Sequence, residues 1–193
     1  MSDLVPLTGE PLALDLVNTR PTTGDLLATP DGLRDWWTLQ AARIPDEVPR
    51  EIGAEDLAAV RAVREHTARA LDFVRRGDQP PAADLLALNQ AQRAAPAISE
   101  LGWTGSAVAV VRRRDGSPGL RLAACLAEAA ADLLVDPAVA TIRACEADDC
   151  VMLFLPTHPR RRWCSAARCG NRMRVARHYQ RHKAGEPQRS KDR

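Results

Sequence analysis

Apolar residues recur at three- and four-residue steps along much of the chain, which is the spacing of one face of an α-helix. The clearest case is the segment 54–76, which is followed by Gly77, a residue type that commonly ends helices. Charged residues in this segment separate apolar positions at Leu57, Val60, Val63, Leu71 and Val74. The same pattern predicts further helices at residues 30–42, 81–95 and 123–135. We therefore expect a mostly α-helical N-terminal domain.

The segment 9–19 is short and apolar, and its periodicity does not distinguish a strand from a two-turn helix. Asp15 and Asn18 are isolated polar residues within it, and we expect Asp15 to cap or pair inside the protein. In the next predicted helix, Trp36 and Trp37 are expected in the core rather than on a binding surface.

The pattern changes after residue 102. Residues 103–112 are rich in β-branched side chains, and Ser117-Pro118-Gly119 is a typical turn sequence. Leu120-Arg121-Leu122 could then return as a second strand. The sequence therefore predicts a small β-hairpin near residues 103–122.

Composition places the chain among globular proteins, because 45% of its 193 residues are hydrophobic. No apolar run reaches the roughly 20 residues that a membrane-spanning helix needs. The first residues, Met1-Ser2-Asp3-Leu4, show neither a basic leader nor an apolar signal core. We expect a cytoplasmic protein without a membrane partner.

The net charge of +2 is unevenly distributed along the chain. Residues 143–193 contain 13 Lys and Arg against 5 Asp and Glu, a net charge of +8. Residues 1–142 contain 14 basic and 20 acidic residues, a net charge of −6. The basic C-terminal part is thus a candidate for contact with a phosphate backbone.

Four of the five cysteines lie in this basic part, at Cys145, Cys150, Cys164 and Cys169. They form two Cys-x4-Cys pairs, and two short-loop pairs are the usual way in which a chain supplies four thiolates to tetrahedral Zn²⁺. Asp148-Asp149 and Gly170-Asn171 are residue types that suit the tight turns such pairs require. In a reducing cytosol, clustered cysteines bind metal more often than they form disulfides. Cys125 stands apart in an apolar stretch and is expected to be a buried, inert thiol.

Three other interpretations of the cysteines remain open at this point. A redox dithiol usually has the tighter Cys-x-x-Cys spacing, and an iron–sulfur cluster could also use four cysteines. His158, which lies between the two pairs, could replace one cysteine as a ligand. The symmetric pairing favours a mononuclear four-cysteine zinc site over each of these.

Two motifs resemble known families. Arg161-Arg162-Trp163-Cys164-Ser165 and Cys169-Gly170-Asn171-Arg172 resemble the C-terminal CGNR zinc finger, whose first half is similar to Cys145, Cys150 and Leu153-Phe154. The segment 12–19, LALDLVNT, looks like the start of the ABATE domain that usually precedes this finger. Pro156 and Arg174 depart from the usual finger pattern, in which acidic residues and lysine are common at these places.

The resemblance implies an architecture and a function. It implies an ABATE-like, mainly helical domain at residues 1–140, a zinc finger with a basic helix at 141–184, and a polar tail at 185–193. The fold class is then mostly α with a small β-hairpin, followed by a four-cysteine zinc-finger module. Proteins of this kind are regarded as stress-induced bacterial transcription regulators, which implies DNA binding.

Basic residues flank the second cysteine pair. The candidate nucleic-acid contacts are Arg160, Arg161, Arg162, Arg172, Arg174, Arg177, His178, Arg181 and Lys183. If the stretch after Cys169 is helical, Arg174, Arg177, His178 and Arg181 lie on one face at three- and four-residue steps. The same residues could instead form a solvated helix with no ligand, and Arg172 could hydrogen-bond the carbonyls of the metal turns.

No catalytic arrangement is evident, and we do not expect an enzyme. There is no glycine-rich phosphate loop, and the single tyrosine, Tyr179, and the four histidines do not suggest a triad. Two hypotheses remain: a zinc-dependent regulator that binds double-stranded DNA, and a zinc-stabilised module that binds an acidic protein partner. That partner could be RNA polymerase or the acidic N-terminal domain of the protein itself. A zinc enzyme is disfavoured because four thiolates leave no open coordination position.

Overall fold

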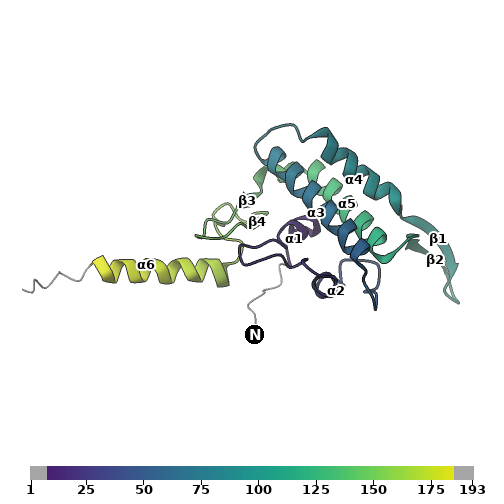
Figure 1. Cartoon of the computed structure of the whole chain (residues 1–193), viewed down its shortest axis with the longest axis horizontal. Helices are drawn as coiled ribbons and strands as arrows, with labels where there is room; N and C mark the ends of the chain where they lie inside the picture. The colour runs from purple at the N-terminus through teal and green to yellow at the C-terminus, as the bar shows by residue number, and fades with distance from the viewer. Residues whose placement is uncertain (1–7, 185–193) are drawn as a thin grey trace, which may run out of the picture.

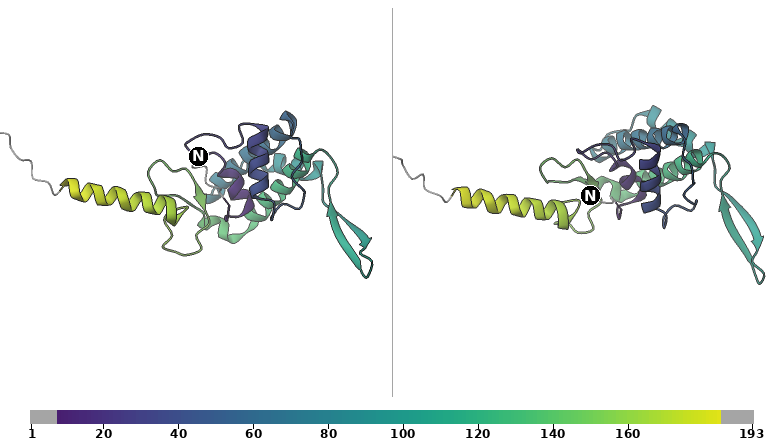
Figure 2. Two further views of the ribbon diagram at one scale, coloured as in Figure 1. Left: turned by 90° about the horizontal axis from the view of Figure 1, so that it is seen from below. Right: turned by 60° about the horizontal axis from the view of Figure 1, so that its bottom comes forward.

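The computed structural model describes residues 8–184 and shows a helical body with two projections (Figure 1). The body contains α1 (Leu12–Val17), α2 (Pro30–Leu39), α3 (Ala54–Arg75), α4 (Ala82–Ala94), α5 (Pro118–Val135) and the short turn η1 (Pro137–Thr141). The projections are the hairpin of β1 (Ile98–Trp103) with β2 (Val108–Arg113), and helix α6 (Asn171–Ala184). They leave opposite ends of the body in both views of Figure 2. The predicted polar tail, residues 185–193, lies outside the described residues.

Helices α3, α4 and α5 lie side by side and form the main layer of the body (Figure 1). In α5, Leu122, Leu126, Ala130 and Leu133 are buried at three- and four-residue steps, which places one stripe of the helix in the core. α5 meets α3 closely at its first turn, where the Gly119 amide donates to Asp56 Oδ1 at 2.8 Å. A Cβ at Gly119 would lie 2.2 Å from Asp56 Cα, so this approach requires glycine.

The segment that periodicity left undecided is helical. It forms α1, in which Leu14 and Leu16 are fully buried against α3 and α5. The expected core positions of Trp36 and Trp37 are confirmed, since these residues are 3% and 0% exposed. Cys125 is half-buried on α5, and burial raises the pKa of its thiol, as expected for an unreactive cysteine.

The predicted hairpin exists, but its predicted position was wrong. Ser117-Pro118-Gly119 does not turn between strands; it begins α5, because Ser117 Oγ accepts a hydrogen bond from the Leu120 amide and Pro118 occupies the first turn. The strands pair earlier, with Ile98 opposite Arg113 and Trp103 opposite Val108. Their turn lies at residues 104–107, where Gly105 has a φ of +94°. A serine–proline pair fits both a turn and a helix start, and here the helix start prevails.

The cysteine-rich finger follows the body. It consists of β3 (Arg143–Ala144) paired with β4 (Leu153–Phe154), of the helical turn η2 (Ala166–Gly170), and of α6, into which η2 leads. Within residues 8–184, no helix combines the length and apolar character needed to cross a membrane.

Candidate metal centre and its setting

The first cysteine pair is carried by the β3–β4 hairpin. Cys145 directly follows β3, and its amide donates to the Met152 carbonyl at 2.8 Å, which extends the strand pairing by one residue. The chain then turns through Asp149, which has a φ of +59°. This left-handed conformation is tolerated by aspartate better than by most residues. The turn brings Cys150 back beside Cys145, as the sequence predicted for Asp148-Asp149.

The second pair brackets η2. Ser165 Oγ accepts the Arg168 amide at 3.3 Å and so caps this turn, which places Cys164 and Cys169 on the same side. Gly170 lies against the ring of Trp163, and a Cβ at Gly170 would be only 3.2 Å from Trp163 Cε3. Trp163 therefore packs over the cysteine loops, and glycine at 170 makes room for it.

The four cysteines converge, and their Sγ atoms all lie within 4.8 Å of one another. The Sγ atoms are separated by 3.8 Å for Cys150–Cys164, 3.6 Å for Cys164–Cys169 and 3.8 Å for Cys169–Cys150. Tetrahedral Zn²⁺ with Zn–S bonds of about 2.3 Å requires sulfur–sulfur edges of about 3.8 Å. The separations exceed the S–S bond of a disulfide, which is about 2.05 Å. The donor set therefore fits a tetrahedral thiolate site.

Electrostatics within the cluster also favour a bound cation. Burial and the neighbouring thiols raise the pKa of Cys150 to about 11 and that of Cys164 further. Burial opposes ionisation of Cys145 as well, but hydrogen bonds from the backbone amides of Cys164 and Ala147 outweigh it and lower its pKa. Several thiolates cannot share this small space without a positive charge among them. A metal ion supplies that charge, and its binding would release the thiol protons.

The alternative ligand His158 does not belong to this cluster. Among the described residues, the only group with metal-ligand spacing is the four cysteines. His158 Nδ1 instead accepts the Arg160 amide at 3.1 Å on an exposed turn.

Asn18 attaches the finger to the body, which the sequence reasoning missed. Its side-chain nitrogen donates to the Leu153 carbonyl at 2.8 Å, and its oxygen accepts the Leu153 amide at 2.8 Å. The side chain thus pairs with the edge of β4 as a neighbouring strand would. An asparagine in an otherwise apolar segment was the available signal, because a buried amide requires partners.

Arg161 provides the second attachment, a structural role that the sequence did not predict for it. Its guanidinium forms an ion pair of 2.5 Å with Glu10 and donates to three carbonyls, those of Leu155, Trp163 and Cys164. It also lies over the Phe154 ring, 4.5 Å from the centroid. The donors of Arg161 are therefore engaged inside the protein, between the finger and the body.

The other arginines near the cluster differ in their availability. Arg162 pairs with Glu146 at 2.5 Å, and Arg172 donates to the Asp148 carbonyl at 2.7 Å, which is the structural role considered for it. Arg160 is exposed. The structure therefore divides the predicted basic set into residues that hold the finger together and residues that face solvent.

Helix α6 carries the remaining predicted contacts. Arg174, Arg177, His178 and Arg181 line one shallow surface depression together with Val175 and Tyr179. Within the described chain, α6 contacts no helix or strand other than η2, and it extends away from the body (Figure 2). The side chain of Lys183 lies outside the described residues.

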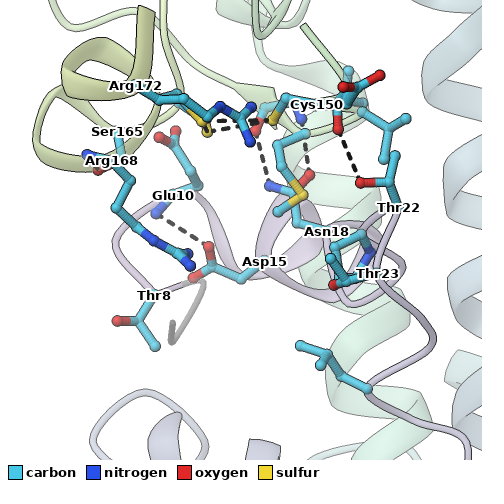
Figure 3. Close-up of a pocket in the computed structure, with 18 residues that line it drawn as sticks. Thr8, Glu10, Asp15, Asn18, Thr22, Thr23, Cys150, Ser165, Arg168 and Arg172 are labelled. Atoms are coloured by element: carbon cyan, nitrogen blue, oxygen red, sulfur yellow. Dashed lines mark hydrogen bonds between the residues drawn. The ribbon is translucent and has the colours of Figure 1, made fainter. Parts of the chain in front are cut away.

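A cavity of about 530 Å³ separates the metal cluster from the start of the body (Figure 3). Its walls include Thr8, Asp15 and Thr22 from the body, and Cys150 and Arg168 from the finger. Figure 3 shows the Arg168 guanidinium directed toward Asp15 across this space.

The polar groups that face the cavity are engaged either within the body, as Asp15 is, or between the body and the finger, as Thr22 is. Asp15 accepts hydrogen bonds from the Gly9 and Glu10 amides, Gln40 and Arg43, which confirms its internal pairing. Burial raises the pKa of Asp15 despite these donors. Thr22 donates to the Asp149 carbonyl at 2.9 Å.

Comparison with known families agrees with this division. Residues 10–137 match the ABATE family, described as "Putative stress-induced transcription regulator". The chain belongs to the ABATE family. Residues 141–182 match the CGNR zinc finger, so that the ABATE region supplies Glu10, Asp15 and Asn18, and the CGNR finger supplies the four cysteines. Both matches are regulatory or zinc-finger families rather than enzyme families. No curated protein matches the chain.

Proposed function

We propose that this protein is a zinc-dependent transcription regulator that binds double-stranded DNA through α6. In this proposal Cys145, Cys150, Cys164 and Cys169 hold one Zn²⁺, and Arg174, Arg177, His178 and Arg181 contact the phosphate backbone. The observation that carries it is the exposed basic strip on a helix whose first residue adjoins the metal cluster.

Zinc is the metal that the donor set supports best. Four thiolates at tetrahedral separations are the usual structural zinc site, and such a site has no open position for a reacting water. When bound, zinc neutralises thiolate charge and ties the β3–β4 turn to the start of α6. The proposal therefore assigns zinc a structural role and assigns the protein no catalytic activity.

The geometry of α6 supports binding to a polyanion. The helix has 14 residues, and at about 1.5 Å per residue it is about 20 Å long, sufficient to lie in a DNA major groove. Arg174, Arg177 and Arg181 form no ion pair within the described chain. A helix of this length is marginal in water without packing partners. Phosphate contacts would both stabilise α6 and use its unpaired charge.

The test combines metal analysis with DNA binding. Elemental analysis of the purified protein should give about one zinc per chain. Binding to a mixed-sequence duplex should weaken steeply as salt rises, because phosphate contacts release counterions. The double variant Arg174→Ala/Arg177→Ala should retain zinc, bind DNA at least ten-fold more weakly and show a salt slope reduced by about 2.

A matched control removes the same charge from the body. Arg50→Ala/Arg93→Ala lies outside the finger and should leave affinity and salt slope near those of the wild type. Equal weakening by both double variants would show that overall charge, rather than the α6 strip, determines binding. Zinc without any DNA binding at low salt would overturn the DNA assignment.

One observation favours a second candidate, a zinc-stabilised module for an acidic protein partner such as RNA polymerase. Val175 and Tyr179 are 46% and 70% exposed and lie beside the basic residues on α6. An apolar pair next to arginines is typical of a helix that docks in a protein groove. In that case Val175→Ala/Tyr179→Ala would abolish binding to the protein partner. Neither the wild type nor this variant would bind duplex DNA.

In either case we place the protein in the cytoplasm of a bacterial cell. The argument is functional: a regulator of bacterial transcription must reach the chromosome and RNA polymerase, which lie in that compartment.

A further inference from the structure

Both faces of the β1–β2 hairpin carry exposed apolar residues: Ile98 and Val111 on one face, and a larger and more exposed set on the other. Antiparallel pairing places Ser99 opposite Arg112, Leu101 opposite Val110 and Trp103 opposite Val108 on one side of the ribbon. We call these six residues the hairpin face. The other side carries the ion pair between Glu100 and Arg113, at 2.9 Å, and is the more polar of the two.

The hairpin face is unusually exposed for its composition. Leu101 is 75% exposed, Trp103 69%, Val108 65% and Val110 60%. Neither strand contacts another helix or strand within residues 8–184, and the ribbon projects away from the body (Figure 2). An isolated two-stranded hairpin is marginally stable in water. Both its solvent-facing apolar layer and its shape therefore indicate a missing partner surface.

The base of the hairpin is held in place. The largely buried Arg114 donates to the Ala95 carbonyl at 2.6 Å and pairs with Glu128 on α5. These contacts join both legs of the ribbon to the body, just before β1 and just after β2. The face is thus presented in a defined direction.

The exposed area is suited to self-association. The four apolar side chains expose together about 500 Å², near the upper limit for a patch on a monomeric protein. Two such faces would bury at most about 1,000 Å² of apolar surface between them, which meets the minimum of about 1,000 Å² for a specific interface and indicates a dimer of modest affinity. A projecting ribbon also lets a second ribbon approach without contact between the two bodies.

The order of residues along the hairpin face is self-complementary. From base to tip the layers are Ser99 with Arg112, Leu101 with Val110, and Trp103 with Val108. When two hairpins pack face to face in opposite directions, the central layers meet at the two-fold axis. The base of each ribbon then lies over the tip of the other, with β2 over β2, so that the cation Arg112 lies over Val108 of the other copy and diagonally across from the ring of Trp103, within reach of its long side chain. A parallel two-fold arrangement would instead place Arg112 over Ser99 of the other copy and keep it far from both Trp103 rings.

We propose that two copies of this chain form a two-fold dimer through their hairpin faces, with Leu101 and Val110 at the centre and Arg112 of each copy at the level of Trp103 of the other, diagonally across the ribbon. The interface does not depend on DNA binding or on zinc. Its consequence is an assembly that presents two α6 helices, one from each end.

The experiment measures molar mass by sedimentation equilibrium across micromolar protein concentrations, with the full-length zinc-loaded protein. The wild type should have the mass of two chains. Leu101→Glu, at the centre of the face, should raise the dissociation constant at least 100-fold and give a monomer. The control Val111→Glu introduces the same charge on the opposite side of the ribbon and should remain dimeric. Circular dichroism should show equal helix content in all three proteins.

Trp103→Ala and Arg112→Ala test the direction of packing. Within one chain these residues are two layers apart, about 13 Å along the ribbon, and cannot touch. A double-mutant cycle on the dimer dissociation constant should therefore show coupling only if they meet across the interface. A monomeric wild type, equal loss with Leu101→Glu and Val111→Glu, or additive effects in the cycle would each overturn the proposed dimer.

Discussion

The body and the finger are stabilised in different ways. The body encloses one continuous cluster of leucine, valine, alanine and tryptophan side chains from α1, α2, α3, α4 and α5. The separate buried cluster of the finger contains only Cys145, Ala147, Met152 and Cys169, so half of it consists of metal ligands. Hydrophobic burial can maintain the body, whereas so small a cluster cannot maintain the finger. We therefore expect the finger to depend on a bound metal where the body depends on packing.

The change from stabilisation by hydrophobic packing to stabilisation by the cysteine cluster occurs within the finger rather than at its first residue. Phe154 on β4 is fully buried, and Leu153 and Leu155 pack against the core of the body. β4 is also the strand whose Leu153 backbone forms two hydrogen bonds with the Asn18 side chain. One half of the finger is therefore attached to the body, and the other half, η2 and α6, is attached to β4 mainly through the cysteines and Arg161.

The largest expected effect comes from breaking the metal site. Cys164→Ser should lose bound zinc, and η2 and α6 should lose their order, because metal affinity is folding free energy in such modules, on the order of 10 kcal/mol in small zinc fingers. The body should keep its helices. Hydrogen exchange resolved along the chain measures both regions in the same sample.

Cys125→Ser is the matched control, since it removes a thiol of the body outside the cluster. It should retain zinc and the protection of α6. Equal loss of protection in α3 and α6 after Cys164→Ser would contradict the division into two regimes.

A smaller effect is expected from removing the hydrogen bonds between Asn18 and β4. Asn18→Leu keeps the side-chain volume but leaves the Leu153 amide and carbonyl without partners, at a cost of about 1–3 kcal/mol for each group. The edge of β4 should then exchange its amides faster while zinc stays bound. The exposed Asn89→Leu on α4 supplies the control. Unchanged exchange at β4 in Asn18→Leu would show that the apolar contacts of Phe154 suffice for docking.

The secondary-structure elements and the cysteine cluster were predicted from the sequence better than the contacts between the body and the finger were. Helical periodicity and cysteine spacing act over short stretches, so α3, the buried Trp36 and Trp37 and the convergence of four cysteines could be anticipated. The pairing of Asn18 with β4 joins positions 135 residues apart, and no local pattern contains such information.

The internal contacts of Arg161 were missed for the same reason. Within the run Arg160-Arg161-Arg162 the three residues look equivalent, yet only Arg161 meets Glu10, which is distant in sequence. The hairpin position was wrong because Ser117-Pro118 serves equally as a turn and as a helix start. Local sequence patterns allow more than one conformation or contact for a residue. Tertiary contacts determine which of these conformations or contacts forms.

The smallest expected effect is the pH dependence of an ion pair in the body, between Asp25 and Arg64. Asp25 accepts two hydrogen bonds from the buried guanidinium of Arg64, at 2.6 and 2.8 Å, and this contact lowers the pKa of its carboxyl to about 2. Because the folded pKa lies below that of the unfolded chain, about 3.9, protonation favours unfolding. The stabilisation is complete above about pH 4 and is lost as pH falls toward 2, and it amounts to at most about 2 kcal/mol.

Urea unfolding of α3 between pH 5 and pH 2.5, followed by helix content in the wild type and in Asp25→Asn, measures this contribution. The variant should be less stable than the wild type at pH 5, and the difference should shrink as the solution is acidified. Asp35→Asn, at an exposed position of α2, should show no such convergence. Metal ligands also protonate in acid, so the measurement requires a signal from the body alone. If the helix signal of the body and the hydrogen-exchange protection of α6 were lost together at every pH, the stability of the body would depend on the finger. The body and the finger would then unfold as one unit.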